Sequence, residues 1–144
     1  MRRDVVIILA LSIACKSAPR GLAYGSADDV DAILKSGGVS GKKLSCVNPN
    51  YDGAVTRGVT CLTDLSAADV TSLTAKIGLG KSAPLLNGGN HDTCETSPNL
   101  GSSNPDVDVL GGKNTAVKNG ASRIEIHVNR TTRAACVQIE YPWG

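Results

Sequence analysis

Residues 123–141 read "RIEIHVNRTTRAACVQIEY" and carry the clearest secondary-structure pattern in this 144-residue chain. Apolar and polar residues alternate from Arg123 to Asn129, which is typical of a half-buried strand. A second run of strand-forming residues ends at Tyr141, and the polar segment "NRTTR" between the two runs has the composition of a turn. The stretch therefore predicts an antiparallel β-hairpin.

Successive side chains of a strand point to opposite faces. One face of residues 123–129 is therefore apolar, and the other carries the guanidinium of Arg123, the carboxylate of Glu125 and the imidazole of His127. Side chains two apart on one strand stand about 7 Å from each other and project in parallel, so they are not expected to converge on one substrate atom. We expect this polar face to be the solvated side of a half-buried strand.

Two short stretches carry the same signal for the start of a helix. Residues 26–30 read "SADDV" and residues 66–70 read "SAADV", each with a serine that can cap the helix and an aspartate three places later. Apolar residues continue at helical spacing until Gly37 in the first case and Gly78 in the second. Each predicted helix is followed by two cysteines, so the repeated order reflects either a degenerate duplication or two independent uses of capping chemistry.

Strand signals also occupy residues 42–47, 53–62 and 106–110, and "GGKN" at residues 111–114 predicts a turn. Residues 79–105 are rich in Gly, Asn, Ser and Pro without a sustained period, which predicts a long loop. Together these signals predict an α+β fold, a small antiparallel β-sheet with one or two short helices packed on one face.

The N-terminus has the layout of an export signal. Arg2 and Arg3 precede an apolar run of 11 residues from Val5 to Cys15, which is too short to span a bilayer as a helix. A basic segment followed by a short apolar segment is typical of a secretory leader.

Two modes of processing remain open for this leader. The segment "LSIAC" resembles the bacterial lipoprotein signal, in which the cysteine, here Cys15, is lipidated and becomes the new N-terminus. The alternative is ordinary cleavage at a small-residue site after Ala23 or Ala27. We therefore assign residues 1–27 to a signal and tether, and residues 28–144 to one globular domain.

The cysteine count agrees with export. Loss of Cys15, as a lipid anchor or with the signal peptide, leaves Cys46, Cys61, Cys94 and Cys136, an even number suited to two disulfides in an oxidising compartment. If the two halves of the chain are related, the pairs are Cys46 with Cys61 and Cys94 with Cys136. No C-x-x-C spacing occurs, so a zinc site is not expected.

Charge argues against a nucleic-acid partner. From Asp28 onward the chain has 11 Lys and Arg against 12 Asp and Glu, a net charge of −1, so it lacks the basic surface that phosphate backbones require. We expect no cofactor, a protein or cell-surface ligand as partner, and membrane contact only through a lipid at Cys15. The expected location is the periplasm, the outer membrane as a lipoprotein, or the medium.

The predicted loop contains "NHDTCET" at residues 90–96, with candidate binding residues His91, Asp92 and Glu95. A transition-metal site made of His91, Asp92 and His127 is conceivable if the predicted second disulfide brings the loop to the hairpin. The residues do not form a recognised metal motif, so no metal ligand is assigned.

Two functions remain open. The first is an exported, disulfide-stabilised binding protein of the cell envelope, favoured because no complete catalytic set is present. The second is a small secreted hydrolase, because Glu125, His127 and an arginine, Arg123 or Arg130, resemble the base, acid and anion stabiliser of small microbial ribonucleases. The resemblance covers residue types alone, since those enzymes draw the three side chains from different strands.

Overall fold

The structure, a computed structural model, describes residues 25–48, 50–51, 54–55, 58–83, 93–114 and 121–141. In these residues the chain forms two helices and eight strands. In chain order they are α1 (Ala27–Ser36), β1 (Ser45–Val47), β2 (Asn50–Tyr51), β3 (Ala54–Val55), β4 (Gly58–Asp64), α2 (Ala67–Ile77), β5 (Gly80–Lys81), β6 (Val107–Asn114), β7 (Ala121–Asn129) and β8 (Ala134–Glu140).

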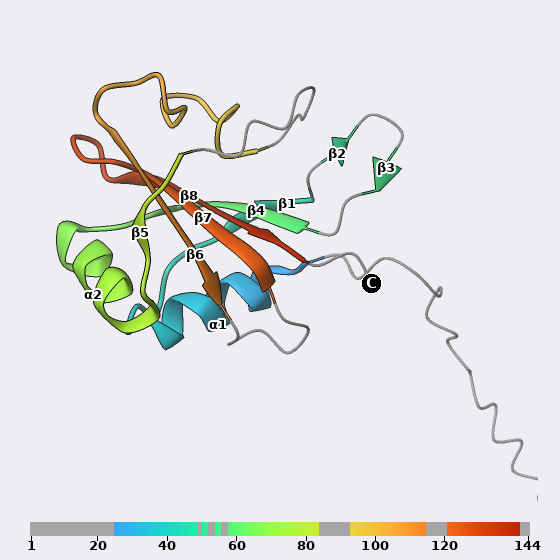
Figure 1. The fold of residues 1–144 in the computed structure, drawn as a ribbon, viewed down its shortest axis with the longest axis horizontal. Coiled ribbons are helices and arrows are strands. Elements are labelled where there is room, and N and C mark those ends of the chain that lie inside the picture. Colours follow the sequence, from blue (N-terminus) through green and yellow to red (C-terminus); the bar gives the residue numbers. More distant parts are fainter. Residues whose placement is uncertain are drawn as a thin grey trace, which may run out of the picture.

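Six strands form one antiparallel sheet in the order β1-β4-β8-β7-β6-β5, and β2 pairs with β3 in a separate ribbon. Both helices lie on one face of the sheet, and the loop at residues 93–106 lies over the opposite face (Figure 1). The predicted α+β fold, with an antiparallel sheet and helices on one face, is confirmed.

The predicted hairpin forms the centre of the sheet as β7 and β8, which pair over residues 123–128 and 135–140. The Asn129 side chain fixes the turn between them. Its Oδ1 accepts hydrogen bonds of 3.0 Å from the backbone N–H groups of Thr131 and Thr132. The local sequence of the turn therefore supports the register of the two strands.

The apolar face of the hairpin forms the core together with the helices. The buried side chains from β7, β8, α1 and α2 include Ile124, Ile126, Val128, Val137, Ile139, Ile33, Leu34 and Leu73. Burial of one such side chain contributes roughly 1.5–3 kcal/mol relative to its exposure. The alternation in the sequence therefore correctly predicts which face of β7 meets the helices.

The predicted helix starts are also confirmed. The carboxylate of Asp29 accepts a hydrogen bond of 3.1 Å from the Ser26 backbone, and Asp69 accepts one of 2.8 Å from Ser66. Gly78 follows α2 in the left-handed conformation, with φ of +69°, which glycine adopts without a steric penalty. Capping chemistry in the sequence thus places both helices.

The fold includes residues that precede the predicted boundary at residue 28. The Asn48 side chain donates hydrogen bonds to the carbonyls of Gly25, at 3.1 Å, and Gly58, at 2.8 Å. Ser26 caps α1. Gly25 and Ser26 therefore contact the folded domain directly.

Both predicted disulfides are present, Cys46–Cys61 and Cys94–Cys136. Cys46 and Cys61 face each other on the neighbouring strands β1 and β4, whereas Cys94 lies in the loop that crosses the sheet and Cys136 lies in β8. The first bond therefore joins two strands, and the second attaches a loop to the sheet, so the surroundings of the two pairs differ.

The predicted turn at residues 111–114 is wrong, because these residues are the second half of β6. A Cβ atom on Gly111 would lie 2.7 Å from the Ser82 side chain, and one on Gly112 would lie 2.9 Å from the Leu79 side chain. The glycines therefore permit close approach of the segment around β5 rather than a reversal of the chain.

Removal of the Cys94–Cys136 bond is expected to destabilise the domain more than removal of Cys46–Cys61. The chain-entropy relation gives about 4 kcal/mol for a sequence separation of 42 residues and about 3 kcal/mol for one of 15. Urea denaturation of the two double Cys→Ala variants measures both losses in unfolding free energy. A larger loss for the shorter loop would contradict this expectation.

Candidate functional site

The polar face of β7 is buried, so the prediction of a solvated strand face is wrong. The exposed fraction is 2% for Glu125, 0% for His127 and 3% for Asn129. The loop at residues 93–106 covers them, and its backbone contacts them directly: the carbonyl of Asn99 accepts a hydrogen bond from the Asn129 side chain. The sheet is therefore covered on both faces at its centre.

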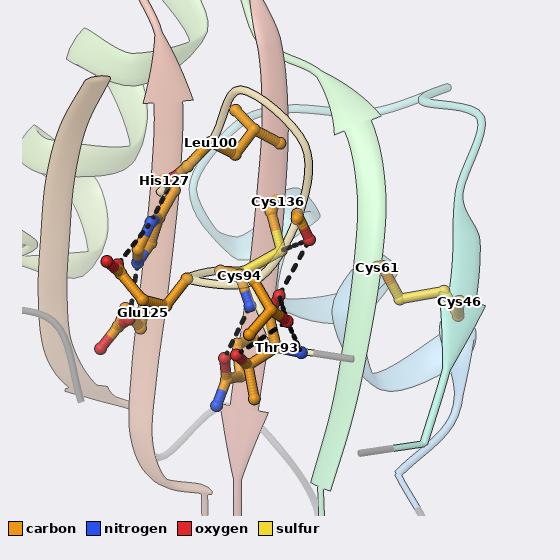
Figure 2. The surroundings of a disulfide bond; sticks show 12 residues. Cys46, Cys61, Thr93, Cys94, Leu100, Glu125, His127 and Cys136 are labelled. Atoms are coloured by element: carbon orange, nitrogen blue, oxygen red, sulfur yellow. Dashed lines mark hydrogen bonds and ion pairs between the residues drawn. A yellow bond between two sulfur atoms is a disulfide. The ribbon is translucent and has the colours of Figure 1, made fainter. Parts of the chain in front are cut away.

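The Cys94–Cys136 disulfide holds the loop in this position (Figure 2). Cys136 is the cross-strand neighbour of His127, so the bond attaches the loop immediately beside the imidazole. The backbone N–H of Cys94 also donates a hydrogen bond of 3.2 Å to Oε1 of Gln138. These two contacts place the loop over the polar side chains of β7, namely Glu125, His127 and Asn129, which we call the covered row.

Glu125 and His127 bond to each other, contrary to the expectation that their side chains remain parallel and apart. Glu125 Oε1 lies 2.6 Å from His127 Nε2 (Figure 2). On the other side of the ring, Nδ1 lies 2.7 Å from the carbonyl oxygen of Leu100 in the loop. A carbonyl only accepts, so Nδ1 carries a proton and donates it, and a single further proton is shared between Nε2 and the carboxyl group.

The surroundings of His127 favour its charged form. Burial by itself lowers the pKa of the imidazole, but the hydrogen bonds to Glu125 and to the Leu100 carbonyl outweigh it, with help from the Glu95 carboxylate 3.9 Å away. The net effect raises the pKa of His127 above its ordinary value of 6.5. The hydrogen bonds of the covered row thus favour the imidazolium form of His127 beside the Glu125 carboxyl group.

Arg123 continues the same row and attaches it to a second segment. Its Nη2 lies 3.5 Å from Glu125 Oε2 and donates hydrogen bonds to the carbonyl of Ala83, at 3.0 Å, and to the hydroxyl of Ser82, at 3.3 Å. The guanidinium, the carboxylate and the imidazole are therefore linked in series. They connect β7 to the segment after β5 and to the covering loop.

This arrangement is suited to holding the loop and not to acid–base chemistry on a substrate. A general acid or base must come within hydrogen-bond reach of the group that it protonates or deprotonates. Both ring nitrogens of His127 are already bonded inside the protein, and the ring is fully buried. The same bonds leave no ring nitrogen directed at a metal ion, which needs a free lone pair.

The loop candidate Glu95 also has a structural partner. Its carboxylate accepts hydrogen bonds from the backbone N–H and the hydroxyl of Ser102, the latter at 2.7 Å, and so closes the loop on itself. The other two candidates, His91 and Asp92, lie outside the described residues, as does Cys15. The metal set of His91, Asp92 and His127 therefore lies partly outside the described residues and stays a prediction.

Among the residues that the structure describes, no group of three or more His, Cys, Asp or Glu side chains is arranged to hold a metal ion. No helix within the same residues has the length and apolar character needed to cross a bilayer.

An open cleft of about 380 Å³ lies between the start of α2 and the β7 end of the central hairpin. We call it the arginine cleft. Its lining residues are Leu65, Ala67, Val70, Thr71, Asp108, Val128, Asn129, Arg130 and Arg133. Its volume falls within the range of small-molecule sites, which is roughly 300–1,000 Å³.

The charges in the arginine cleft are unbalanced. Arg130 forms an ion pair with Asp108 and donates a hydrogen bond of 2.7 Å to the carbonyl of Pro105. Within the described chain, the Arg133 side chain makes no hydrogen bond or ion pair, and it is exposed. One carboxylate and two guanidinium groups leave one positive charge uncompensated beside apolar side chains.

The backbone holds Arg133 at this position. Its N–H donates a hydrogen bond of 2.8 Å to the Asn129 carbonyl, and its own carbonyl accepts one of 3.0 Å from Leu65. Its φ is +65°, a value that few residues other than glycine adopt. The sequence indicated a polar turn here, but the cleft depends on α2 packing beside that turn, for which no local signal exists.

A second hollow of about 200 Å³ lies between β1, β4 and the covering loop. The exposed side chains of Val47 and Leu62 line it, together with the buried Thr60, whose hydroxyl has no hydrogen-bond partner. It is smaller than the arginine cleft and has no charged side chain in its lining. The arginine cleft is therefore the stronger candidate for a ligand site.

Comparisons with protein families, with curated proteins and with solved structures give no match to this chain.

The raised pKa of His127 predicts that the fold loses stability as the pH rises. The folded protein binds the imidazolium proton more tightly than the unfolded chain, so the contribution is complete below pH 6.5 and is lost as the pH passes the raised folded pKa. NMR titration of the His127 ring gives that pKa directly. Urea denaturation at several pH values gives the slope of the unfolding free energy.

Two variants serve as controls for this slope. His127→Gln removes the titrating group, and Glu125→Gln removes the carboxylate that raises its pKa, so both are expected to flatten the profile over the same pH range. An unchanged slope in His127→Gln would show that another group is responsible.

Proposed function

We propose that this chain is an exported, disulfide-stabilised binding protein without catalytic activity, and that it takes its ligand in the arginine cleft. The observation that carries the proposal is a contrast between two regions. The acid–base pair Glu125 and His127 is buried under a covalently held loop, whereas the arginine cleft is open and contains Arg133, a cation with no partner in the part of the chain that the structure describes.

The rival ribonuclease-like function would require rearrangement. His127 would have to give up the hydrogen bonds to Leu100 and Glu125, and the loop held by Cys94 would have to leave the face of β7. Moving the loop would also expose an ion pair that is now satisfied inside the protein. Because both ring nitrogens of His127 are bonded inside the protein, the covered row is better explained as a set of contacts that fixes the loop.

Export is supported by chemistry from two parts of the chain. Two disulfides are compatible with an extracellular or exported protein, because such bonds persist in oxidising compartments. The basic and apolar layout of the N-terminus supports a leader. Its processing is proposed to occur at Cys15 or after Ala23, because cleavage after Ala27 would remove Gly25 and Ser26, which belong to the fold.

Filling the arginine cleft is expected to abolish binding. Thr71 lines the cleft and is exposed on α2, so Thr71→Trp places an indole ring in the space that the ligand would occupy. The probe is N-phenyl-1-naphthylamine, a neutral apolar dye whose fluorescence rises when it leaves water. We expect saturable dye binding to the wild-type protein and at least a tenfold loss of affinity in Thr71→Trp.

Thr74→Trp is the matched control, because Thr74 is exposed on the same helix but does not line the cleft. It introduces the same side chain at the same cost in helix propensity. Equal affinity of the two variants for the dye, or no saturable binding to the wild-type protein, would contradict the proposed site.

The lipid anchor has a separate test. Metabolic labelling with a palmitate analogue in a bacterial host is expected to mark the wild-type protein and to place it in the membrane fraction. Cys15→Ala is expected to lose both the label and the membrane association, because one cysteine carries the acyl chains. Persistent labelling of Cys15→Ala would contradict lipidation at this residue.

A further inference from the structure

We infer that the ligand of the arginine cleft is a small aliphatic carboxylic acid, with its carboxylate at Arg133 and its hydrocarbon chain on the apolar floor. This inference rests on the proposed function, since it names the ligand class for the same cleft. Four properties of the cleft carry it: charge, floor, backbone accessibility and size.

The net positive charge of the cleft favours a ligand with one anionic group. Asp108 already neutralises Arg130, whereas Arg133 has no partner among the described residues. A single carboxylate would therefore complete the charge balance of the site, whereas an ammonium group would face a net positive charge.

The apolar side chains that form the floor of the cleft favour a ligand with a hydrocarbon chain. Leu65 and Val128 are buried beneath the cleft, and Val70 is half-buried on α2. The Thr71 hydroxyl is already used, because it donates to the Ala67 carbonyl at 2.9 Å. Apart from the arginines, the cleft therefore offers the ligand chiefly hydrocarbon contacts. Each methylene group of the ligand that leaves water there contributes favourably to the binding free energy.

The backbone around the cleft argues against a peptide. Peptide recognition usually depends on main-chain hydrogen bonds to a strand edge or a comparable row of free groups. Here α2 uses its backbone groups within the helix beyond its first turn, and β7 is paired with β6 on one side and with β8 on the other. A ligand with one polar end and no repeating amide groups matches this lining better.

The size of the cleft agrees with a small ligand. A volume of about 380 Å³ lies near the lower end of the range for small-molecule sites and is too small for a docked helix. A medium-length aliphatic acid has one charged end for Arg133 and a flexible chain for the floor. It therefore meets the charge, the apolar contacts and the space together.

Three eight-carbon compounds test the inference: octanoate, 1-octanol and octylamine share a chain and differ in the polar end. Displacement of the dye or titration calorimetry gives their affinities. Octanoate is expected to bind at least tenfold more tightly than the other two, because the bond to Arg133 is charge-assisted. Affinity is also expected to rise about fourfold with each methylene group from butanoate to octanoate.

Arg133→Gln separates the charge from the apolar contacts. It is expected to weaken octanoate about tenfold and to leave 1-octanol unchanged. Lys43→Gln is the matched control: it also removes one positive charge from an exposed position, but Lys43 does not line the cleft. Equal affinities of the wild-type protein for octanoate and 1-octanol, or an unchanged affinity of Arg133→Gln for octanoate, would overturn the inference.

Failure of the inference and failure of the proposed function give different results. If Thr71→Trp blocks the neutral dye while octanoate shows no preference over 1-octanol, the cleft binds ligands but the carboxylate assignment is wrong. If neither dye nor acid binds the wild-type protein, both proposals are wrong. If a tripeptide that ends in leucine displaces the dye at lower concentration than octanoate, the small-acid assignment is replaced by recognition of a peptide terminus.

Discussion

The disulfide between Cys94 and Cys136 is the constraint on which the arrangement of this protein depends. It joins a loop to β8 across 42 residues of sequence and fixes the loop beside His127. Without such a bond, a polar loop would gain little by covering a polar strand face, because both already hydrogen-bond to water. The covalent bond removes much of the entropy that would otherwise oppose this contact.

Once the loop is in place, the chemistry of the covered residues follows from the loss of water. A carboxylate and an imidazole in a dry site are stable only if they satisfy each other and their remaining hydrogen-bonding groups. Glu125 and His127 do so through their 2.6 Å contact, and the Leu100 carbonyl accepts a hydrogen bond from the second ring nitrogen. Residues that resemble a catalytic set thus act together to hold the loop against β7.

The same topology leaves the opposite side of the sheet partly open. α1 and α2 cover the apolar face, but the β7–β8 turn extends beside the first turn of α2 and leaves the arginine cleft between them. Arg133 is fixed there by backbone hydrogen bonds to Asn129 and Leu65. The charged residues that attract attention in the sequence are therefore buried under the loop, while the proposed binding site lies beside α2, at the edge of the apolar core.

The sequence by itself determined much of the local structure: alternation identified β7 and its apolar face, and Ser26 and Ser66 marked the helix starts. Cysteine parity predicted two disulfides, whereas their pairing was predicted only on the condition that the two halves of the chain are related. These features depend on neighbouring residues or on simple counting. Only the tertiary structure decided that Glu125 and His127 are buried, that Gly111 lies within a strand, and that Arg133 borders a cleft. Each of these results depends on a segment that is distant in sequence. The loop after Cys94 buries Glu125 and His127, the segment around Ser82 packs against Gly111, and helix α2 forms the other side of the cleft at Arg133. Local periodicity contains no information about which segment packs against a face.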